Sequence, residues 1–188
     1  MLTQLNNLRL AFPNVFKPSA RTQGETPYYS ALFPVEPGSA NDKLIRANIE
    51  KVAKEKFGAK AEKRLAMIAE KGDVFYKEGP KKNKDGDPYD GFDGMNHFRA
   101  SNKNRLVIVD RKGQPIKEDD GVIYAGCIVN VQVDIWLQDN QFATRVNGKL
   151  LAIQFVKDAE PFGGGVRVGV DTFEALEDEE EEETSDIG

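Results

Sequence analysis

The sequence predicts a mainly β fold, either a barrel or a sandwich, in which one helical segment follows the second strand. About seven short runs are rich in branched or aromatic residues or alternate apolar with polar ones, and turns with Gly or Pro separate them. Residues 40–71 instead carry apolar side chains every three to four positions, as a helix does. A small Greek-key barrel with this helical insertion is the better fit, although the pattern alone leaves the sandwich open.

Strands are expected on both sides of the helical segment. The first covers residues 8–12, where apolar side chains alternate, and Pro13 ends it. Residues 73–95 form a long irregular loop, and long ordered loops in compact domains are often functional. Asn147-Gly148 is a strong hairpin signal. The other strands are expected over residues 28–35, 95–101, 105–110, 122–137, 142–146, 150–156 and 166–170.

The helical segment has recognisable start and stop signals. Ser39 or Asn41 can cap its first turn. Gly58 interrupts the apolar periodicity, and Gly72 is the expected C-terminal stop. The sequence therefore predicts two consecutive helical stretches.

The charge is divided between two regions. All 26 Lys and Arg residues precede residue 171, together with 21 of the 31 Asp and Glu residues, so residues 1–170 carry a net charge of +5 and residues 171–188 one of −10. We expect one domain over residues 1–170 and a disordered acidic tail over residues 171–188. A basic body joined to a polyanion suggests a polyanionic ligand, whose groove the tail can occupy; a tail that only aids solubility is the alternative. The tail residues expected to bind partners are Glu177, Asp178, Glu179, Glu180, Glu181, Glu182, Glu183, Asp186 and Ile187.

Several protein classes do not fit the sequence. The longest apolar runs are far shorter than the ~20 residues of a membrane-spanning helix, and residues 1–7 lack the features of a signal peptide. The single Cys127 excludes an internal disulfide, and the single His97 excludes a His-pair metal site. The sequence shows no convincing catalytic set, so we expect a non-enzymatic protein of a reducing cytoplasm.

The long run after Gly126 separates into two faces. One face is a continuous apolar row that must be core, made of Cys127, Val129, Val131, Val133, Ile135 and Leu137. The opposite face is mainly polar but carries Trp136, the only tryptophan. A large ring on a wet sheet face suits the stacking of unpaired bases. The alternative is that Trp136 packs under the long loop or the helix.

Basic side chains gather in two neighbouring stretches, one in the strand around His97 and one in the loop before it. Lysines there interleave with aromatic residues, and lysines bind phosphates as point charges. A solvated sheet face and a solvated lysine cluster are the alternatives. The residues expected to bind nucleic acid are Trp136, Phe75, Tyr76, Lys77, Lys81, Lys82, Lys84, His97, Arg99, Lys103 and Arg105.

Asp85, Asp87, Asp90 and Asp93 form the one cluster that suggests a metal. The spacing resembles a calcium loop only in part, because the glycine comes one position early and no glutamate closes the loop. Asp-Gly and Asp-Pro pairs are also ordinary turn chemistry. We therefore expect no metal and no cofactor, and a Mg²⁺-dependent nuclease built on these aspartates stays an alternative function.

Seven motifs follow one another along the chain: residues 9–18 (RLAFPNVFKP), 29–31 (YSA), 96–103 (NHFRASNK), 109–110 (VD), 124–127 (YAGC), 153–158 (IQFVKD) and 160–165 (EPFGGG). In their order and spacing, these motifs resemble those of the single-stranded DNA-binding proteins of tailed bacteriophages. The resemblance implies an OB-type core with additions, binding of single-stranded DNA during phage replication or recombination, and a disordered acidic tail that contacts replication partners. The chain departs from the tip of bacterial single-strand binders because it ends in Gly188 without an aromatic residue.

The resulting hypothesis is a sequence-independent single-stranded DNA-binding protein with an OB-like Greek-key β-barrel, a helical insertion and a disordered acidic tail. Exposed rings stack on bases, basic side chains hold phosphates, and the tail competes for the groove or recruits phage or host replication proteins. The nuclease and an adaptor that works mainly through the tail and does not bind DNA are the rivals. The oligomeric state is left open, with a homodimer among the options, and the expected location is the cytoplasm of the bacterial host.

Overall fold

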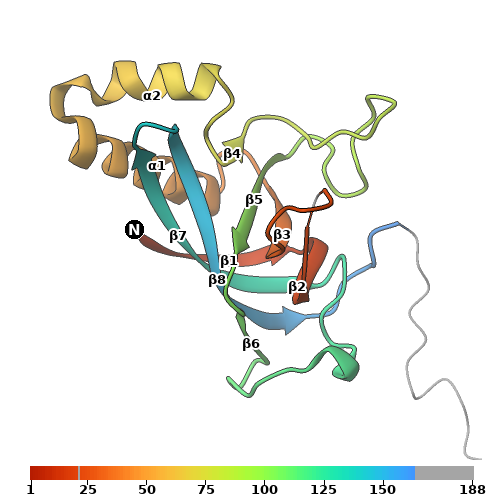
Figure 1. The fold of residues 1–188 in the computed structure, drawn as a ribbon. Coiled ribbons are helices and arrows are strands. Elements are labelled where there is room, and N and C mark those ends of the chain that lie inside the picture. Colours follow the sequence, from red (N-terminus) through yellow and green to blue (C-terminus); the bar gives the residue numbers. More distant parts are fainter. Residues whose placement is uncertain (21, 164–188) are drawn as a thin grey trace, which may run out of the picture.

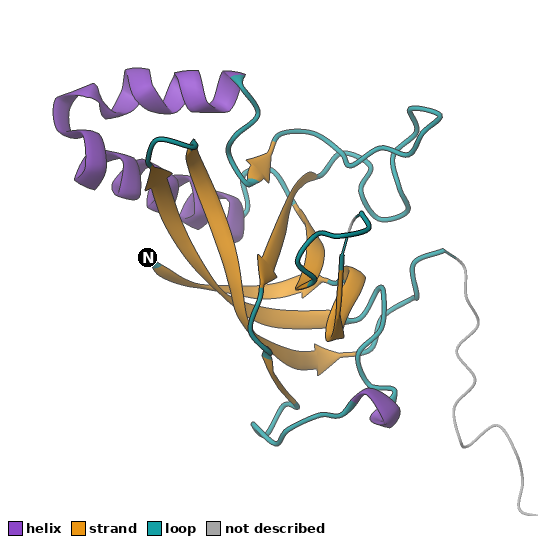
Figure 2. Ribbon diagram, in the orientation of Figure 1, coloured by secondary structure: helices purple, strands orange, loops and turns teal. Residues whose placement is uncertain are grey.

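The computed structural model describes residues 1–20 and 22–163, and this part of the chain contains eight strands and two α-helices (Figure 1, Figure 2). The strands are β1 (Leu2–Arg9), β2 (Ala11–Ser19), β3 (Tyr28–Val35), β4 (Tyr76–Lys77), β5 (Asn96–Asn102), β6 (Val107–Val109), β7 (Ile128–Asp139) and β8 (Thr144–Lys157). The helical elements are α1 (Ala40–Phe57), α2 (Ala61–Glu70) and the short 3-10 turns η1 (Gly58–Lys60) and η2 (Glu118–Asp120). The predicted strand over residues 166–170 and the acidic tail lie outside the described residues.

The sheet closes into a barrel because β1 and β2 act as one long strand. They continue each other across Leu10, whose amide donates to the Cys127 carbonyl (3.0 Å) and whose carbonyl accepts from Gly126 (2.7 Å). β1 pairs with β7 and β2 pairs with β3, while β7, β8, β5 and β3 are neighbours in that order. The two ends of the strand order therefore meet. The predicted Greek-key barrel is confirmed, and the sandwich is not formed.

The barrel interior is the core that the sequence predicts. Cys127, just before β7, and Val129, Val131, Val133 and Ile135 on one face of β7 are all buried, whereas Leu137 at the end of the predicted row is half-buried. On the far side of the interior, the rings of Phe33 and Phe98 stack with their centroids 4.9 Å apart. Burial of this apolar row fixes the register of β7, because a slip by one residue would turn every core side chain to solvent.

The helices form the predicted insertion after the second barrel strand and lie together at one end of the barrel (Figure 1). The Ser39 hydroxyl caps α1 by accepting from the Asp42 amide (3.2 Å). Gly58 separates α1 from α2 with a φ of +55°, and Gly72 follows α2 with a φ of +74°. α1 packs against β1 and β7, so it covers the barrel without entering the sheet.

The hairpin predicted at Asn147-Gly148 is wrong. β8 runs through both residues, where Asn147 pairs with Trp136 and Gly148 with Ile135. The sequence also predicts a turn at residues 138–141 that pairs residues 142–146 back; the β7–β8 turn lies at residues 140–143. Gly148 is needed for packing, because a Cβ atom on it would lie 2.5 Å from the ring of Phe75. The strands expected over residues 142–146 and 150–156 are therefore one continuous strand.

Two other strand boundaries also differ from the prediction. Pro13 does not end the first strand, because the register shifts between Ala11 and Asn14 and β2 continues to Ser19. Such an irregularity tolerates a residue without an N–H group. β7 begins at Ile128 and not at residue 122. Neither α-helix of the described chain is long and apolar enough to span a membrane.

Candidate nucleic-acid interface

The outer face of β5 carries the polar stripe that the sequence predicts. His97 and Arg99 are half-buried, whereas Phe98 and Ala100 between and beside them are fully buried in the barrel. The Arg99 guanidinium donates from Nη1 to the hydroxyl of Ser30 on β3 (3.1 Å). β3 and β5 are the second and third strands of the barrel, and in OB folds this face binds oligonucleotides.

β4 adds further basic groups to this face. Lys77 pairs with His97 across the β4–β5 ladder, and His97 Nδ1 donates to the Gly79 carbonyl (2.9 Å). Burial lowers the pKa of His97; the hydrogen bond to Gly79 opposes this change, and the charges of Lys81 and Lys77 lower the pKa further. The fold thus gathers Lys77, His97 and Arg99 on one face. Because its pKa is lowered from the ordinary value, His97 is the neutral member of the three at pH 7.

The long loop predicted over residues 73–95 is interrupted by β4, and its remainder, residues 78–95, projects from the barrel between β4 and β5 (Figure 1). This segment is called the basic arm for its three lysines, although it also carries Glu78 and four aspartates. It is folded and not a loose chain. The Tyr89 amide donates to the Lys81 carbonyl (2.9 Å), and the Asn83 amide donates to the Asp87 carbonyl (2.8 Å). Lys81, Lys82 and Lys84 are exposed on this turn.

In the aspartate-rich part of the basic arm, the Asn83 side chain holds the turn and the Asp90 carboxylate anchors the arm. The Asn83 side chain accepts from the amides of Asp85 (2.9 Å) and Asp87 (3.0 Å), and the Asp90 carboxylate accepts from the Gly163 amide (2.9 Å). Over residues 1–20 and 22–163, no group of three or more His, Cys, Asp or Glu side chains is placed to hold a metal ion. The described structure therefore gives the nuclease alternative no gathered metal site.

Two rings predicted to stack on bases are used inside the protein. Tyr76 is 7% exposed, and its hydroxyl donates to the Asp42 carboxylate (2.5 Å). Phe75 is half-buried; its ring meets Phe98 edge-on at 5.7 Å and lies against Gly148. The prediction that Tyr76 offers an exposed stacking surface is wrong, because β4 directs this side chain under α1.

Other exposed rings lie beside the basic residues, and sequence analysis missed them. Phe12 was expected to continue the buried face of Leu8 and Leu10, but its φ of +46° turns it outward, where it is 43% exposed. It contacts Tyr89 of the basic arm edge-on at 5.0 Å. Tyr28 is 37% exposed, and the Lys103 ammonium lies 5.7 Å from its ring centroid. Only the proline after Phe12 hints at this irregularity in the sequence.

The turn between β7 and β8 presents a further ring. Phe142 is 83% exposed, the highest exposure among the large apolar side chains of the described residues. Its position is fixed, because the Asn140 side chain accepts from the amides of Phe142 (3.0 Å) and Ala143 (3.1 Å). In OB folds the loop between the fourth and fifth strands borders the oligonucleotide, and this turn is that loop.

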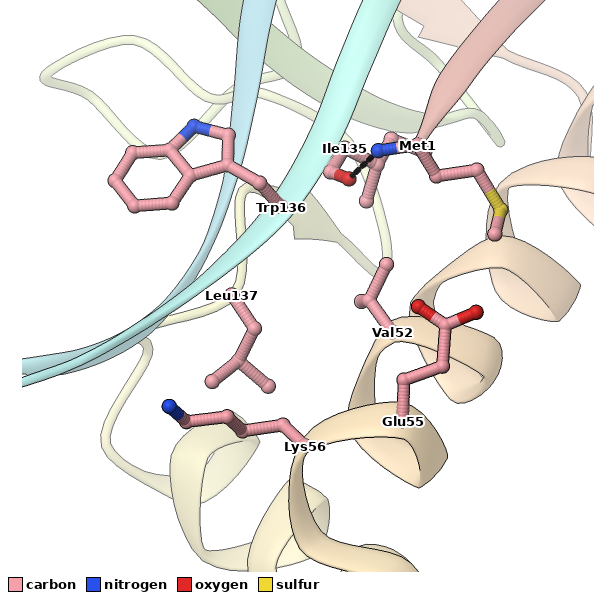
Figure 3. A pocket seen from close by; sticks show the side chains of 7 residues that line it. All are labelled: Met1, Val52, Glu55, Lys56, Ile135, Trp136 and Leu137. Atoms are coloured by element: carbon pink, nitrogen blue, oxygen red, sulfur yellow. Dashed lines mark hydrogen bonds between the residues drawn. The ribbon is translucent and has the colours of Figure 1, made fainter.

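Trp136 lies on a different part of the surface. It is 41% exposed on the polar face of β7 as predicted, at the margin of a hollow of about 300 Å³ between β7 and α1. Figure 3 shows its indole pointing away from Met1 and Glu55. Because β8 lies between β7 and β5, the fold does not bring Trp136 together with the basic residues of β5.

The remaining predicted residues divide between exposed and undescribed positions. Arg105 is exposed between β5 and β6. The tail residues predicted to bind partners lie outside the described part of the chain. The surface that the structure does assemble is called the β3–β5 face below; it consists of Phe12, Tyr28, Ser30, Lys77, Lys81, Tyr89, His97, Arg99 and Lys103.

Two sequence comparisons relate the chain to phage proteins. The model of the family described as Enterobacter phage Enc34, ssDNA-binding protein, matches residues 1–185. Putative protein p50 of Acyrthosiphon pisum secondary endosymbiont phage 1 is 37% identical over 188 residues, which cover 97% of this chain and 98% of that protein.

Solved structures show the same fold. The single-stranded DNA-binding protein from bacteriophage Enc34, in complex with ssDNA, superimposes with a TM-score of 0.67 at 24% identity, over 86% of this chain and 89% of that one. The single-stranded DNA-binding protein gp2.5 of bacteriophage T7 gives a TM-score of 0.56 at 15% identity, over 89% and 98%. The OB-type barrel implied by the resemblance is confirmed.

Proposed function

Because the chain belongs to the family of the Enterobacter phage Enc34 single-stranded DNA-binding protein, we propose that it binds single-stranded DNA without sequence preference and has no enzymatic role. It acts in phage DNA replication, recombination or repair in the host cytoplasm. The observation that carries this proposal is the β3–β5 face, where basic side chains and exposed rings lie together on the strands that bind oligonucleotides in OB folds.

Basic groups on this face hold phosphates. Lys77, Lys81, Arg99 and Lys103 flank the path along β5. The exposed Lys82 and Lys84 on the basic arm and the exposed Arg105 beyond β5 extend it. Neutralisation of phosphates releases counterions, so five contacts would give log affinity a slope of about −3.5 against log salt.

Aromatic rings make the second kind of contribution to the affinity. The exposed Phe12 and Tyr28 and the half-buried Tyr89 can stack on bases, and every base offers a π-face, so stacking does not depend on sequence. Phe142, on the turn between β7 and β8, and Trp136 on β7 extend the path if the strand continues onto this hairpin. Each stack contributes roughly 1–3 kcal/mol.

The acidic tail acts on the same face. Residues 171–188 carry ten acidic side chains and no basic one, so they compete with phosphates for the basic groups at low salt and recruit phage or host replication proteins. Competition within one chain depends on the high effective concentration that a tether gives.

The test measures fluorescence anisotropy of labelled oligo-dT with the full chain and with a chain that lacks residues 172–188, at two salt concentrations. The full chain should bind oligo-dT more tightly than duplex of the same length, and removal of the tail should tighten binding at low salt and less at high salt. Failure of both chains to bind oligo-dT would refute the function. Equal binding by the two chains at low salt would refute tail competition alone.

A further inference from the structure

A buried carboxylate joins the helical insertion to the strand that carries the basic arm. Asp42, in the first turn of α1, is 5% exposed. It accepts from the Tyr76 hydroxyl (2.5 Å), from Arg46 Nε (2.8 Å) and from the Gly38 amide (2.8 Å). Burial raises the pKa of Asp42, but these three donors together lower it below its usual value. The carboxylate is therefore a charged acceptor that holds Tyr76 in place.

Tyr76 passes this constraint to β5. Its hydroxyl also accepts from Asn96 Nδ2 (3.2 Å), and Asn96 Oδ1 accepts from the Gly79 amide (2.9 Å). The next residue of β5, His97, donates from Nδ1 to the Gly79 carbonyl (2.9 Å). Both backbone groups of Gly79 are thus held by side chains of adjacent β5 residues.

Gly79 is the base of the basic arm. Lys81 follows it by two residues, and the Lys81 carbonyl accepts from the Tyr89 amide (2.9 Å), which brings the returning half of the arm to the same place. A second link runs outside this path, because Arg46 also donates to the Glu78 carboxylate (2.9 Å). The hydrogen bonds therefore form a continuous path from α1 to Gly79, and Lys81 follows Gly79 by two residues along the chain.

We propose that Tyr76 and Asn96 are positioning residues for single-stranded DNA binding: they fix the basic arm over the β3–β5 face without contacting the ligand. The proposal rests on the function proposed above. An arm held in its binding conformation before DNA arrives loses less conformational entropy on binding. A hydrogen-bonded network with every member satisfied holds one geometry, whereas a half-broken one leaves buried polar groups without partners.

Tyr76→Phe separates positioning from stacking. The variant keeps the ring and removes only the hydroxyl, so a residue that stacked on bases would keep its contribution, whereas a positioning residue would lose it. We expect about fivefold weaker binding of oligo-dT, in the range of mutations that act on a binding site without touching the ligand. Asn96→Ala should weaken binding to a similar extent. The double variant should bind oligo-dT with about the affinity of the more impaired single variant, because both substitutions break the same path.

The matched control is Asn48→Ala. Asn48 also lies on α1, and its Nδ2 atom donates to the Thr3 hydroxyl on β1 (2.8 Å), so the variant removes a polar contact of α1 that leads away from the arm. We expect a similar loss of thermal stability and unchanged affinity. Hydrogen exchange of the Gly79 and Tyr89 amides should accelerate in Tyr76→Phe and not in Asn48→Ala.

The outcomes are distinguishable. Tyr76→Phe and Asn96→Ala with wild-type affinity, in a protein that binds oligo-dT, would overturn the positioning role and leave the proposed function intact. Equal weakening by Asn48→Ala would also overturn it, because the effect would then follow stability alone. Absence of oligo-dT binding by the wild-type chain would instead refute the proposed function itself.

Discussion

Two parts of the barrel surface carry exposed rings, and they differ in their charged neighbours. On the β3–β5 face, the Lys103 ammonium lies 5.7 Å from the ring centroid of Tyr28, and Phe12 contacts Tyr89 of the arm. On β7, the neighbours of Trp136 have mixed charge, because both Glu55 and Lys56 line the adjacent hollow. Asp134, two positions before Trp136 on the same strand, forms an ion pair with the N-terminal ammonium of Met1 (2.6 Å).

This difference teaches that an exposed ring alone does not identify a nucleic-acid surface. Phosphates follow every base of a single strand, so each stacking ring needs a cation within reach of the neighbouring phosphate. The residues of the β3–β5 face include several cations and no carboxylate, whereas the cation near Trp136, Lys56, is accompanied by Glu55. Binding energy should therefore be concentrated on the β3–β5 face.

The largest effect should come from the basic groups of this face. Replacing Lys77, Lys81, Arg99 and Lys103 together by Gln should weaken oligo-dT binding more than about a hundredfold at 0.1 M salt and reduce the salt slope by roughly 3, since each phosphate contact adds about 0.7 to the slope. Anisotropy titrations over a salt series measure both quantities.

A matched charge change on the helices is the control. Lys51, Lys54, Lys60 and Lys63 are exposed on the helical insertion, and their replacement by Gln changes the net charge by the same amount. The salt slope should stay near that of the wild type. A similar loss in both variants would mean that total charge, and not the β3–β5 face, determines affinity.

Single rings should have the next largest effect. Phe12→Ala should weaken binding by roughly 1–3 kcal/mol, the usual contribution of one stacked base. Phe12→Tyr keeps an aromatic face and should bind nearly as the wild type does. Circular dichroism checks the fold, because the φ of +46° at this position is unfavourable for Ala as well. Unchanged affinity of Phe12→Ala would remove this ring from the site.

Trp136→Ala sharpens the comparison between the two surfaces. We expect a loss of about 1 kcal/mol or less, at the low end for a stacked base, because fewer cations surround this ring. As the only tryptophan, Trp136 also reports directly through its fluorescence. A loss as large as that of Phe12→Ala, with strong quenching by oligo-dT, would extend the binding surface onto β7 and contradict the concentration of energy on the β3–β5 face.

The fold was predictable where short-range periodicity determines it. The alternation in β7 identifies its core face because side chains of a strand point to opposite sides regardless of the partner. Gly58 and Ser39 mark helix boundaries through their own backbone preferences and hydrogen-bonding groups. Gly148 shows the limit: the same residue suits a turn or a close contact, and only the position of Phe75 decides between them.

The candidate site was predictable in its basic residues and not in its rings. Lys81 and Arg99 could be found because charged side chains stay near solvent almost wherever the chain places them. A ring gains from burial as well as from stacking, so its role depends on tertiary contacts. Tyr76 is buried because Asp42, 34 residues away, accepts its hydroxyl hydrogen, and Phe12 is exposed because of an irregular φ.

The smallest predicted effect concerns His97. As the pH falls, its titration should lower the free energy of unfolding and raise the affinity for oligo-dT. Its pKa in the folded protein is lowered, first by burial and then also by Lys81 and Lys77. The unfolded chain, with an ordinary His pKa of about 6.5, therefore binds the proton more readily below that pH. The free energy of unfolding should have its full His97 contribution above about pH 6.5 and lose it as the pH falls.

The affinity for DNA should have the opposite pH dependence to the stability, because a bound phosphate interacts with the protonated ring. A phosphate near His97 favours the protonated ring, so DNA binding takes up a proton and oligo-dT affinity should rise as the pH falls from 7.5 to 5.5. The rise should not exceed about fivefold, the effect of one solvated charge pair of about 1 kcal/mol. His97→Asn removes the titration and keeps an amide that can donate to Gly79. Persistence of the pH-dependent rise in His97→Asn would assign it to another group and place His97 outside the phosphate path.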